Sequence, residues 1–256
     1  CVRTLADEES VLRSAALACI KSLVLLSLKW AQETNKLGWL SSVNGIVMPA
    51  VRKGVKQSAD SIKKIYIQLL KHCALSLGQA FPDEGVYHGD LAFLMHEDPE
   101  QDFFENIGHI QAHRRGKAIR RVMKALGAST SLGVSDEKEE KPEYAELGVD
   151  EEVAPVALSG NVEAPLGQAS LVHVIIPLAL HHLTSKEFTR KDHQQLMNES
   201  AALVGASGAC LAWSPYLATF KGLVKLLERG DADRERVQLA ALCHFLDAFH
   251  FDMSGP

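Results

Sequence analysis

Residues 171–183 read LVHVIIPLALHHL, and residues 213–228 read WSPYLATFKGLVKLLE. The first stretch is apolar nearly all round, whereas the second places its apolar residues three and four positions apart, the spacing of one helix face. Pro177 and Pro215 lie 38 residues apart (215 − 177), and Pro49 lies in a similar apolar stretch. A period of roughly 40 residues is typical of HEAT and armadillo units. The sequence therefore predicts an all-α fold, a HEAT/armadillo-like α-solenoid of antiparallel helix pairs.

Further helices are expected along most of the chain. An aromatic content of 6%, with Leu and Ala as the main apolar residues, favours stacked helices over a β-sandwich. Asp98-Pro99 is typical of a helix start, with Asp as N-cap and Pro at the first helical position. Turn or loop structure is expected at 35–44 and 81–95. The apolar periodicity predicts helices at residues 10–32, 58–77, 98–109, 112–126, 191–212, 215–228 and 233–249. The last helix is expected to carry one apolar stripe, formed by Leu239, Leu242, Leu246 and Phe249.

Residues 127–169 differ in kind from the helical parts. They show little periodicity, and residues 136–152 carry nine acidic residues against Lys138 and Lys141. Such a segment cannot bury enough apolar surface to offset its ordering entropy. We therefore expect HEAT-like repeats at 1–126 and 170–256, separated by a disordered acidic insertion at 127–169. Because the chain opens almost directly in a helix, without the polar cap that ends a solenoid, we expect a segment of a longer solenoid.

Charge and cysteine content narrow the functional classes. The net charge is −5, so any contact with nucleic acid must come from a local patch. Five cysteines without C-x-x-C spacing favour a reducing compartment, with Cys19, Cys210 and Cys243 as core residues. No signal peptide is recognised. The apolar stretch 15–30 contains two lysines and is expected to be a buried helix, not a membrane span.

No pattern indicates catalysis, a metal site or a cofactor. His109 and His113 have the spacing of a zinc-protease helix, but Ile110 stands where the Glu would be. The other histidines lack nearby cysteines or carboxylates in a ligand pattern. No phosphate-binding glycine loop or serine nucleophile elbow occurs. We expect no catalytic residue, no metal, no cofactor, no small-molecule substrate and no membrane contact, and we interpret the chain as not an enzyme.

One helix carries an unusual row of charges. Arg114, Lys117, Arg121 and Lys124 are spaced to share a helix face, opposite an apolar face that includes Ile119. One interpretation is an ordinary solvated face. The other is a contact for RNA phosphate or for an acidic partner segment, since four aligned cations make an electrostatic footprint.

Three further arginines are expected to be structural. Arg115 lies on the apolar side of the same helix, which favours a partly buried ion pair over a ligand contact. Arg13 and Arg236 follow acidic turn residues, Asp7 and Asp231, by six and five positions. An ion pair between such a turn carboxylate and an Arg of the next helix is common in HEAT units.

The residues around this helix resemble a known family. Residues 102–115 read DFFENIGHIQAHRR, which resembles the D-F-F-x-N-x-x-H-I-Q-x-H-R-R motif of the down-regulated-in-metastasis family of U3 small nucleolar RNA-associated proteins. Two later stretches, WSPY at 213–216 and LDAFHFD at 246–252, resemble further signatures of the family in the same order. The resemblance covers about residues 97–126 and 171–252.

The resemblance carries its own expectations. Members of this family are long HEAT-repeat scaffolds of the small-subunit processome in the nucleolus of the nucleus, where they support pre-rRNA processing and biogenesis of the small ribosomal subunit. The expected partners are other processome proteins, with pre-rRNA or U3 RNA reached through the basic helix. The alternative is a generic HEAT adaptor or a karyopherin-like, peptide-binding scaffold.

Overall fold

The structure is a computed structural model, and it describes residues 1–34, 36–57, 59–82, 84–127, 166–185, 188, 190–229 and 234–252. Every regular element within these ranges is helical, so the predicted all-α class is confirmed. The α-helices span Ser10–Thr34 (α1), Met48–Gly54 (α2), Asp60–Ala80 (α3), Phe103–Asn106 (α4), Ala112–Ala125 (α5), Gln168–Ser170 (α6), Ile176–Thr184 (α7), Arg190–Ala209 (α8), Trp213–Glu228 (α9) and Glu235–Asp247 (α10).

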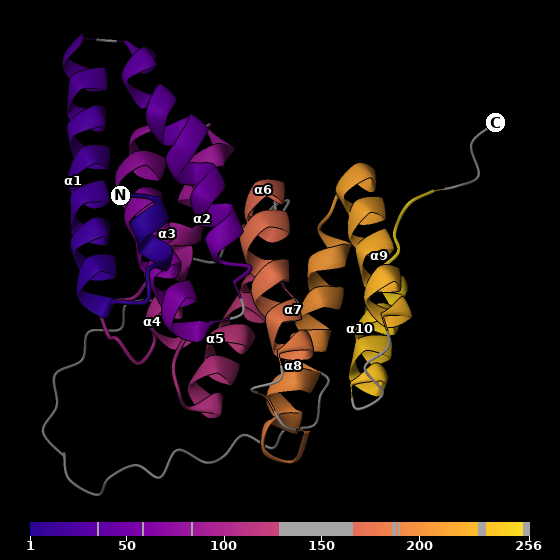
Figure 1. The fold of residues 1–256 in the computed structure, drawn as a ribbon. Coiled ribbons are helices and arrows are strands. Elements are labelled where there is room, and N and C mark those ends of the chain that lie inside the picture. The colour runs from indigo at the N-terminus through magenta and orange to yellow at the C-terminus, as the bar shows by residue number, and fades with distance from the viewer. Residues whose placement is uncertain are drawn as a thin grey trace, which may run out of the picture.

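The helices stand side by side in a row that runs from α1 to α9 and α10 (Figure 1). Helix α1 packs on α3, α5 packs on α8, and α8 also contacts α7 and α10, while α9 packs on α10. Gly205 lets α8 and α10 approach closely, because a Cβ there would lie 2.7 Å from the Cβ of His244. The main hydrophobic cluster extends from Leu5 to Phe245 and so joins the helices on both sides of the predicted insertion.

Two of the prolines lie just after a π-helical turn. The π turns are Val43–Val47, before Pro49 in α2, and Leu171–Ile175, before Pro177 in α7. Proline has no N–H to donate within a helix, and a wider turn before it tolerates this missing hydrogen bond. Pro215 instead lies in the first turn of α9, where an N–H has no helical partner anyway. The predicted turn at 35–44 is only partly correct, because residues 41–54 are helical throughout.

The helix predicted to start at Asp98-Pro99 begins later. Asp102 is the N-cap of α4, and its side chain accepts a hydrogen bond from the N–H of Glu105. Asp98 closes a turn instead, by accepting from the N–H of Glu100 at 2.8 Å. The predicted loop at 81–95 also contains structure, in the 3-10 helices Gly85–Tyr87 and Gly89–Leu94.

Several residues predicted to be buried are exposed. Helix α1 buries one face, and only 22% of its most apolar window lies inside the structure, so the expectation of a buried helix is wrong. By length and composition α1 is the one helix in the described part of the chain that could cross a membrane. Cys19 and Cys243 are exposed and Cys210 is partly buried, whereas Cys73 lies in the core. In α10 the buried residues include Val237, Ala241 and Phe245, and the predicted stripe lies on another face, with Leu239, Leu246 and Phe249 exposed.

The predicted acidic insertion can be placed only at its edges. Residues 128–165 lie outside the described residues, so the prediction of disorder there stays a prediction. At the downstream edge, Leu166 is buried and Gln168 begins α6, which places ordered structure a few residues before the expected boundary at 170.

Candidate interaction surface

The four cations predicted to line one face of α5 have different environments. Lys117 and Lys124 are exposed, but Arg114 and Arg121 are only partly so. Arg121 donates to the main-chain oxygens of Gln101 at 2.6 Å and Met95 at 3.3 Å. Arg114 lies 3.4 Å from the carboxylate of Glu100. The four cations therefore do not form one uniformly exposed row, because the preceding loop packs against the two arginines. Whether this face contacts RNA or an acidic partner stays a prediction.

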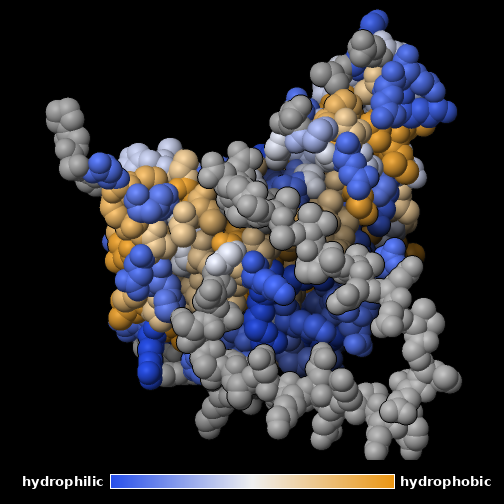
Figure 2. All heavy atoms as spheres, turned by 180° about the vertical axis from the view of Figure 1, so that it is seen from behind, coloured by the Kyte–Doolittle hydropathy of each residue, from blue (hydrophilic) through white to orange (hydrophobic). Residues whose placement is uncertain are grey.

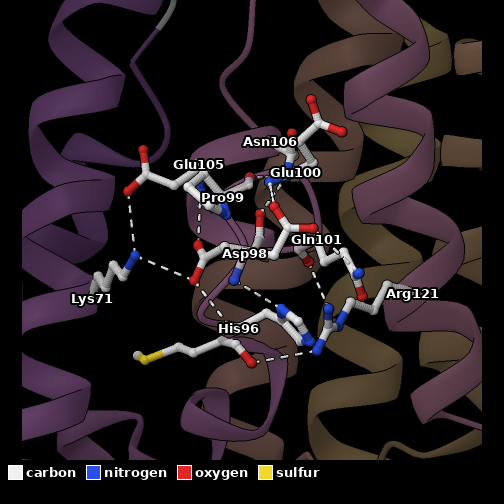
Figure 3. A network of polar contacts seen from close by, with 11 residues as sticks. Lys71, His96, Asp98, Pro99, Glu100, Gln101, Glu105, Asn106 and Arg121 are labelled. Carbon is white, nitrogen blue, oxygen red and sulfur yellow. Dashed lines mark hydrogen bonds and ion pairs between the residues drawn. The ribbon is translucent and has the colours of Figure 1, made fainter. Parts of the chain in front are cut away.

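The carboxylates of Asp98 and Asp102 organise that loop. Figure 3 shows the network of polar contacts around them. Asp98 accepts from the N–H of Glu100, which lowers the pKa of Asp98, with smaller lowering contributions from Gln101, His96 and Lys117. Asn106 donates its amide to the main-chain oxygens of Pro99 at 2.8 Å and Asp102 at 2.7 Å. These contacts fold residues 96–106 into a tight unit in front of α5.

Asp102 attaches this unit to α3. Its carboxylate accepts from the main-chain N–H groups of Glu105 and His96, at 3.0 and 3.1 Å, and lies 3.2 Å from the ammonium of Lys71 in α3. The side chain of Asp102 is 1% exposed, so these partners replace the water that the carboxylate loses. Lys71 also pairs with Glu105 at 3.2 Å. The Asp and Asn of the DFFEN stretch thus have structural roles.

Arg115 forms a buried ion pair on the inner side of α5. Its guanidinium lies 2.8 Å from the carboxylate of Asp60 in α3, donates to the main-chain oxygen of His109, and stacks over the ring of Phe188 with 4.9 Å to the centroid. Asp60 also lies 3.0 Å from Lys63 and 3.2 Å from His181 in α7. Three helices, α3, α5 and α7, therefore meet at one carboxylate.

The charges around Asp60 keep it ionised. Partial burial alone would raise the pKa of this carboxyl group. The hydrogen bond from His181 and the charge and hydrogen bond of Arg115 outweigh that effect, with Lys63 adding to them, and hold the pKa of Asp60 far below its usual range. Asp60 therefore supplies a permanent negative charge that offsets the burial of Arg115.

A second ion pair joins α5 to α8. Glu199 is 5% exposed in its side chain and pairs with Arg120, while Gln195 also donates to it at 3.1 Å. Gly116 makes room for this carboxylate, because a Cβ at that position would lie 2.6 Å from Oε2 of Glu199. Helix α5 thus fits α8 by charge at Arg120 and by size at Gly116.

The remaining predicted ion-pair arginines lie elsewhere. Arg13 donates to the main-chain oxygens of Asp7 at 2.7 Å and Glu8 at 2.9 Å, so it closes the start of α1 through backbone rather than carboxylate contacts. Arg236 is exposed, and its expected partner Asp231 lies outside the described residues. The buried arginine in this region is Arg234, which donates to the oxygen of Phe188 at 3.5 Å.

A buried Ser and His and a partly buried Asp lie together, but not in the order of a catalytic triad. Ser170 donates its proton to Asp90 at 2.6 Å, so His88 must donate Nδ1–H to the Ser170 oxygen at 3.0 Å. A nucleophile would need the histidine to take the serine proton. Both His88 and Ser170 are at most 1% exposed. In the parts of the chain that the structure describes, no three His, Cys, Asp or Glu side chains gather to hold a metal ion.

Sequence reasoning missed the acidic partners of α5. Asp60 is 55 positions from Arg115, and Glu199 is 79 positions from Arg120. No local spacing links residues so far apart, and the helix-start position of Asp60 has an ordinary local interpretation. Asp102 could have been found, because an Asp directly before the apolar pair Phe103-Phe104 is an N-cap signal as good as Asp98.

Comparison with known proteins bears on the same motif. No family model matches the chain. The chain is 23% identical over 202 residues, 78% of its length, to the U3 small nucleolar RNA-associated protein 20 of Saccharomyces cerevisiae. It is 23% identical over 233 residues, 91% of its length, to the protein of the same name from Schizosaccharomyces pombe. The predicted family resemblance is confirmed.

The two relatives are much longer than this chain. The aligned region is 6% of the Saccharomyces protein and 8% of the Schizosaccharomyces protein, so the chain spans less than a tenth of the length of either relative. Both alignments nevertheless cover most of the chain, well beyond the length of a single motif.

Proposed function

We propose that the chain is a non-catalytic scaffold element of a U3 RNA-associated assembly, the small-subunit processome, and supports pre-rRNA processing and formation of the small ribosomal subunit in the nucleolus. The observation that carries this proposal is the similarity to two proteins named for association with U3 small nucleolar RNA. The contacts made by residues 102–115, the stretch DFFENIGHIQAHRR that carries the family resemblance, support the proposal that the chain acts as a scaffold.

The use of the polar residues in this stretch argues for a structural role. Asp102, Asn106 and Arg115 all bind groups within the chain, at distances between 2.8 and 3.2 Å for the contacts to Lys71, Pro99 and Asp60. An active site would be expected to direct such groups toward a cavity. Here they hold α3, α4 and α5 together, which is what a scaffold requires.

We further propose that the helices form HEAT-like repeats. Helices α7 and α8 pack together, as do α9 and α10, and α8 also packs on α10. This arrangement is that of two stacked helix pairs. Apolar side chains remain exposed at both ends of the row, including Leu23 and Leu26 on α1 and Leu239 and Leu246 on α10. Further helix pairs stacked on these faces would bury them, as in a longer solenoid.

Purification of the tagged protein from cells tests this function. We expect U3 RNA and processome proteins in the eluate, enriched over a spliceosomal small nuclear RNA as control. The karyopherin-like alternative predicts transport cargo and no U3 enrichment, and that outcome would overturn the proposal.

A further inference from the structure

A groove of about 460 Å³ lies between α7 and α9. Val172, Ile176 and Leu180 line it at four-residue steps along the π turn and α7, and Leu226 faces them from α9. The groove exists because α7 packs on α8 and α9 packs on α10 (Figure 1). Its volume lies within the roughly 300–1,000 Å³ found for ligand sites, which is enough to take several side chains.

The rim of this groove is cationic. Lys56, Lys225 and Arg229 line it and are exposed, and its lining within the described residues includes no Asp or Glu. None of the three cations takes part in an ion pair between described residues. Along α9, Lys221, Lys225 and Arg229 follow at four-residue steps, a spacing at which like charges repel. An anionic partner would relieve this repulsion.

Gly222 keeps the groove open from the side of α9. It lies in the interior of a 16-residue helix, where glycine costs about 1 kcal/mol relative to alanine. No neighbouring backbone requires this glycine, since a Cβ there would meet nothing within 4 Å. A side chain at position 222 would therefore start in open space at the lining of the groove, where a large one occupies part of its volume.

We propose that this groove binds an acidic amphipathic helix of a partner protein. Its carboxylates pair with Lys56, Lys225 and Arg229. Its apolar side chains cover the partly exposed Val172, Leu180 and Leu226 of the groove. The cationic rim requires a partner with negative charge, and the apolar floor requires one that also carries apolar side chains. A polyphosphate backbone would satisfy the rim but leave the floor in water, whereas a helix with apolar residues three and four positions apart satisfies both. The inference goes beyond the scaffold function and does not depend on it.

Titration with a labelled peptide tests the proposal on the full chain. The probe is a 20-residue synthetic helix with Glu on one face and Leu on the other, and the matched control has the same composition in scrambled order. We expect saturable binding of the amphipathic peptide, with Kd at least about tenfold weaker for the scrambled one. Lys225→Glu with Arg229→Glu should weaken binding about tenfold or more, because attraction becomes repulsion.

Two position-222 variants separate groove occupancy from general charge. Gly222→Trp should abolish binding by filling the groove, while Gly222→Ala should bind like the natural chain. Lys36→Glu, at an exposed position just after α1, reverses a charge outside the groove and should leave the Kd unchanged. Circular dichroism of each variant checks that the fold is retained.

Three outcomes would overturn the proposal. One is peptide binding that Gly222→Trp leaves intact. Another is tighter binding of a 20-nucleotide single-stranded RNA that is lost in the same variants, which would make the groove an RNA site. The third is zero-length carbodiimide cross-linking of Lys56 or Lys225 to carboxylates of residues 136–152, which would assign the groove to this chain itself.

Discussion

Single side chains join distant helices in this chain, and Asp60 is the clearest case. It pairs with Arg115, whose side chain is 6% exposed. Asp60→Asn keeps the shape but removes the counter-charge, so Arg115 would stay buried beside a neutral amide. We expect a loss of about 2 kcal/mol in the free energy of unfolding, reduced from larger values because Asp60 is partly exposed. Urea unfolding measures this loss.

A matched control is Glu33→Gln. Glu33 pairs with Lys29 at 3.7 Å, and both side chains are more than half exposed. Such pairs contribute little to stability. Equal effects of the two substitutions would show that the Asp60 cluster does not hold the helices together.

Buried histidines should make the chain sensitive to acid. Burial lowers the pKa of His88 to about 3, with smaller contributions from Arg52 and His173, and burial also holds the pKa of His182 well below its ordinary value. Both groups are neutral in the folded chain but take up protons near pH 6.5 when unfolded. The stability they contribute is therefore full above about pH 6.5 and is lost as the pH falls toward about 3.

His88→Asn tests this pH dependence. Asn tolerates the left-handed backbone of position 88, where φ is 58°. Removing one such titration should reduce the slope of unfolding free energy between pH 6 and pH 4 by about 1.4 kcal/mol per pH unit. Urea unfolding at three pH values gives the slope, and an unchanged slope would mean that His88 is not neutral and buried in the fold.

At the scale of elements, helix existence was predictable and helix contacts were not. The periodicity of α3 and α5 located both within a few residues, because one apolar face is written into the local sequence. The helix start predicted at Asp98-Pro99 was wrong, although local signals favour it. Asp102 is the N-cap instead, because its carboxylate also pairs with Lys71 and its main-chain oxygen accepts from Asn106. The stripe chosen for α10 was wrong because several of its faces are apolar, and only the position of α8 decides which is buried.

Substitutions of Asp98 and Asp102 test which of the two aspartates stabilises the start of α4. Asp102→Ala removes an N-cap, the buried one of the two partners of Lys71, and an acceptor for the N–H of His96. We therefore expect a loss of about 3 kcal/mol in unfolding free energy. Asp98→Ala should cost much less, because Asp98 closes an exposed turn. Thermal unfolding of both variants measures the order. A larger effect at Asp98 would support the start predicted from sequence.

Substitutions on the outer face of α5 can distinguish a binding role from a structural role. Lys117→Gln with Lys124→Gln should leave the thermal midpoint unchanged, because both side chains are exposed. If this face contacts RNA phosphate, the double variant should weaken association with U3-containing particles and reduce its dependence on salt. Arg121→Gln should instead lower the thermal midpoint, because it loses the oxygens of Gln101 and Met95. Unchanged association and salt dependence in the double variant would leave α5 with a structural role alone.

At the scale of the whole molecule, the row of helices has apolar side chains on the faces at its ends. Seen from behind, apolar residues gather along the edge formed by the C-terminal helices, while hydrophilic residues gather in the lower middle of that face (Figure 2). This distribution fits an element that is stacked between others and presents polar groups along its side. The sequence alone could not show this, because exposure depends on which helix faces meet.

Pre-rRNA processing after depletion of the protein tests the central claim most directly. Pulse labelling of ribosomal RNA separates maturation of the small-subunit RNA from that of the large-subunit RNA in one experiment. A scaffold of the small-subunit processome predicts accumulation of precursors to the small-subunit RNA and loss of its mature form, with the large-subunit RNA maturing normally. Normal maturation of the small-subunit RNA in depleted cells would contradict the account.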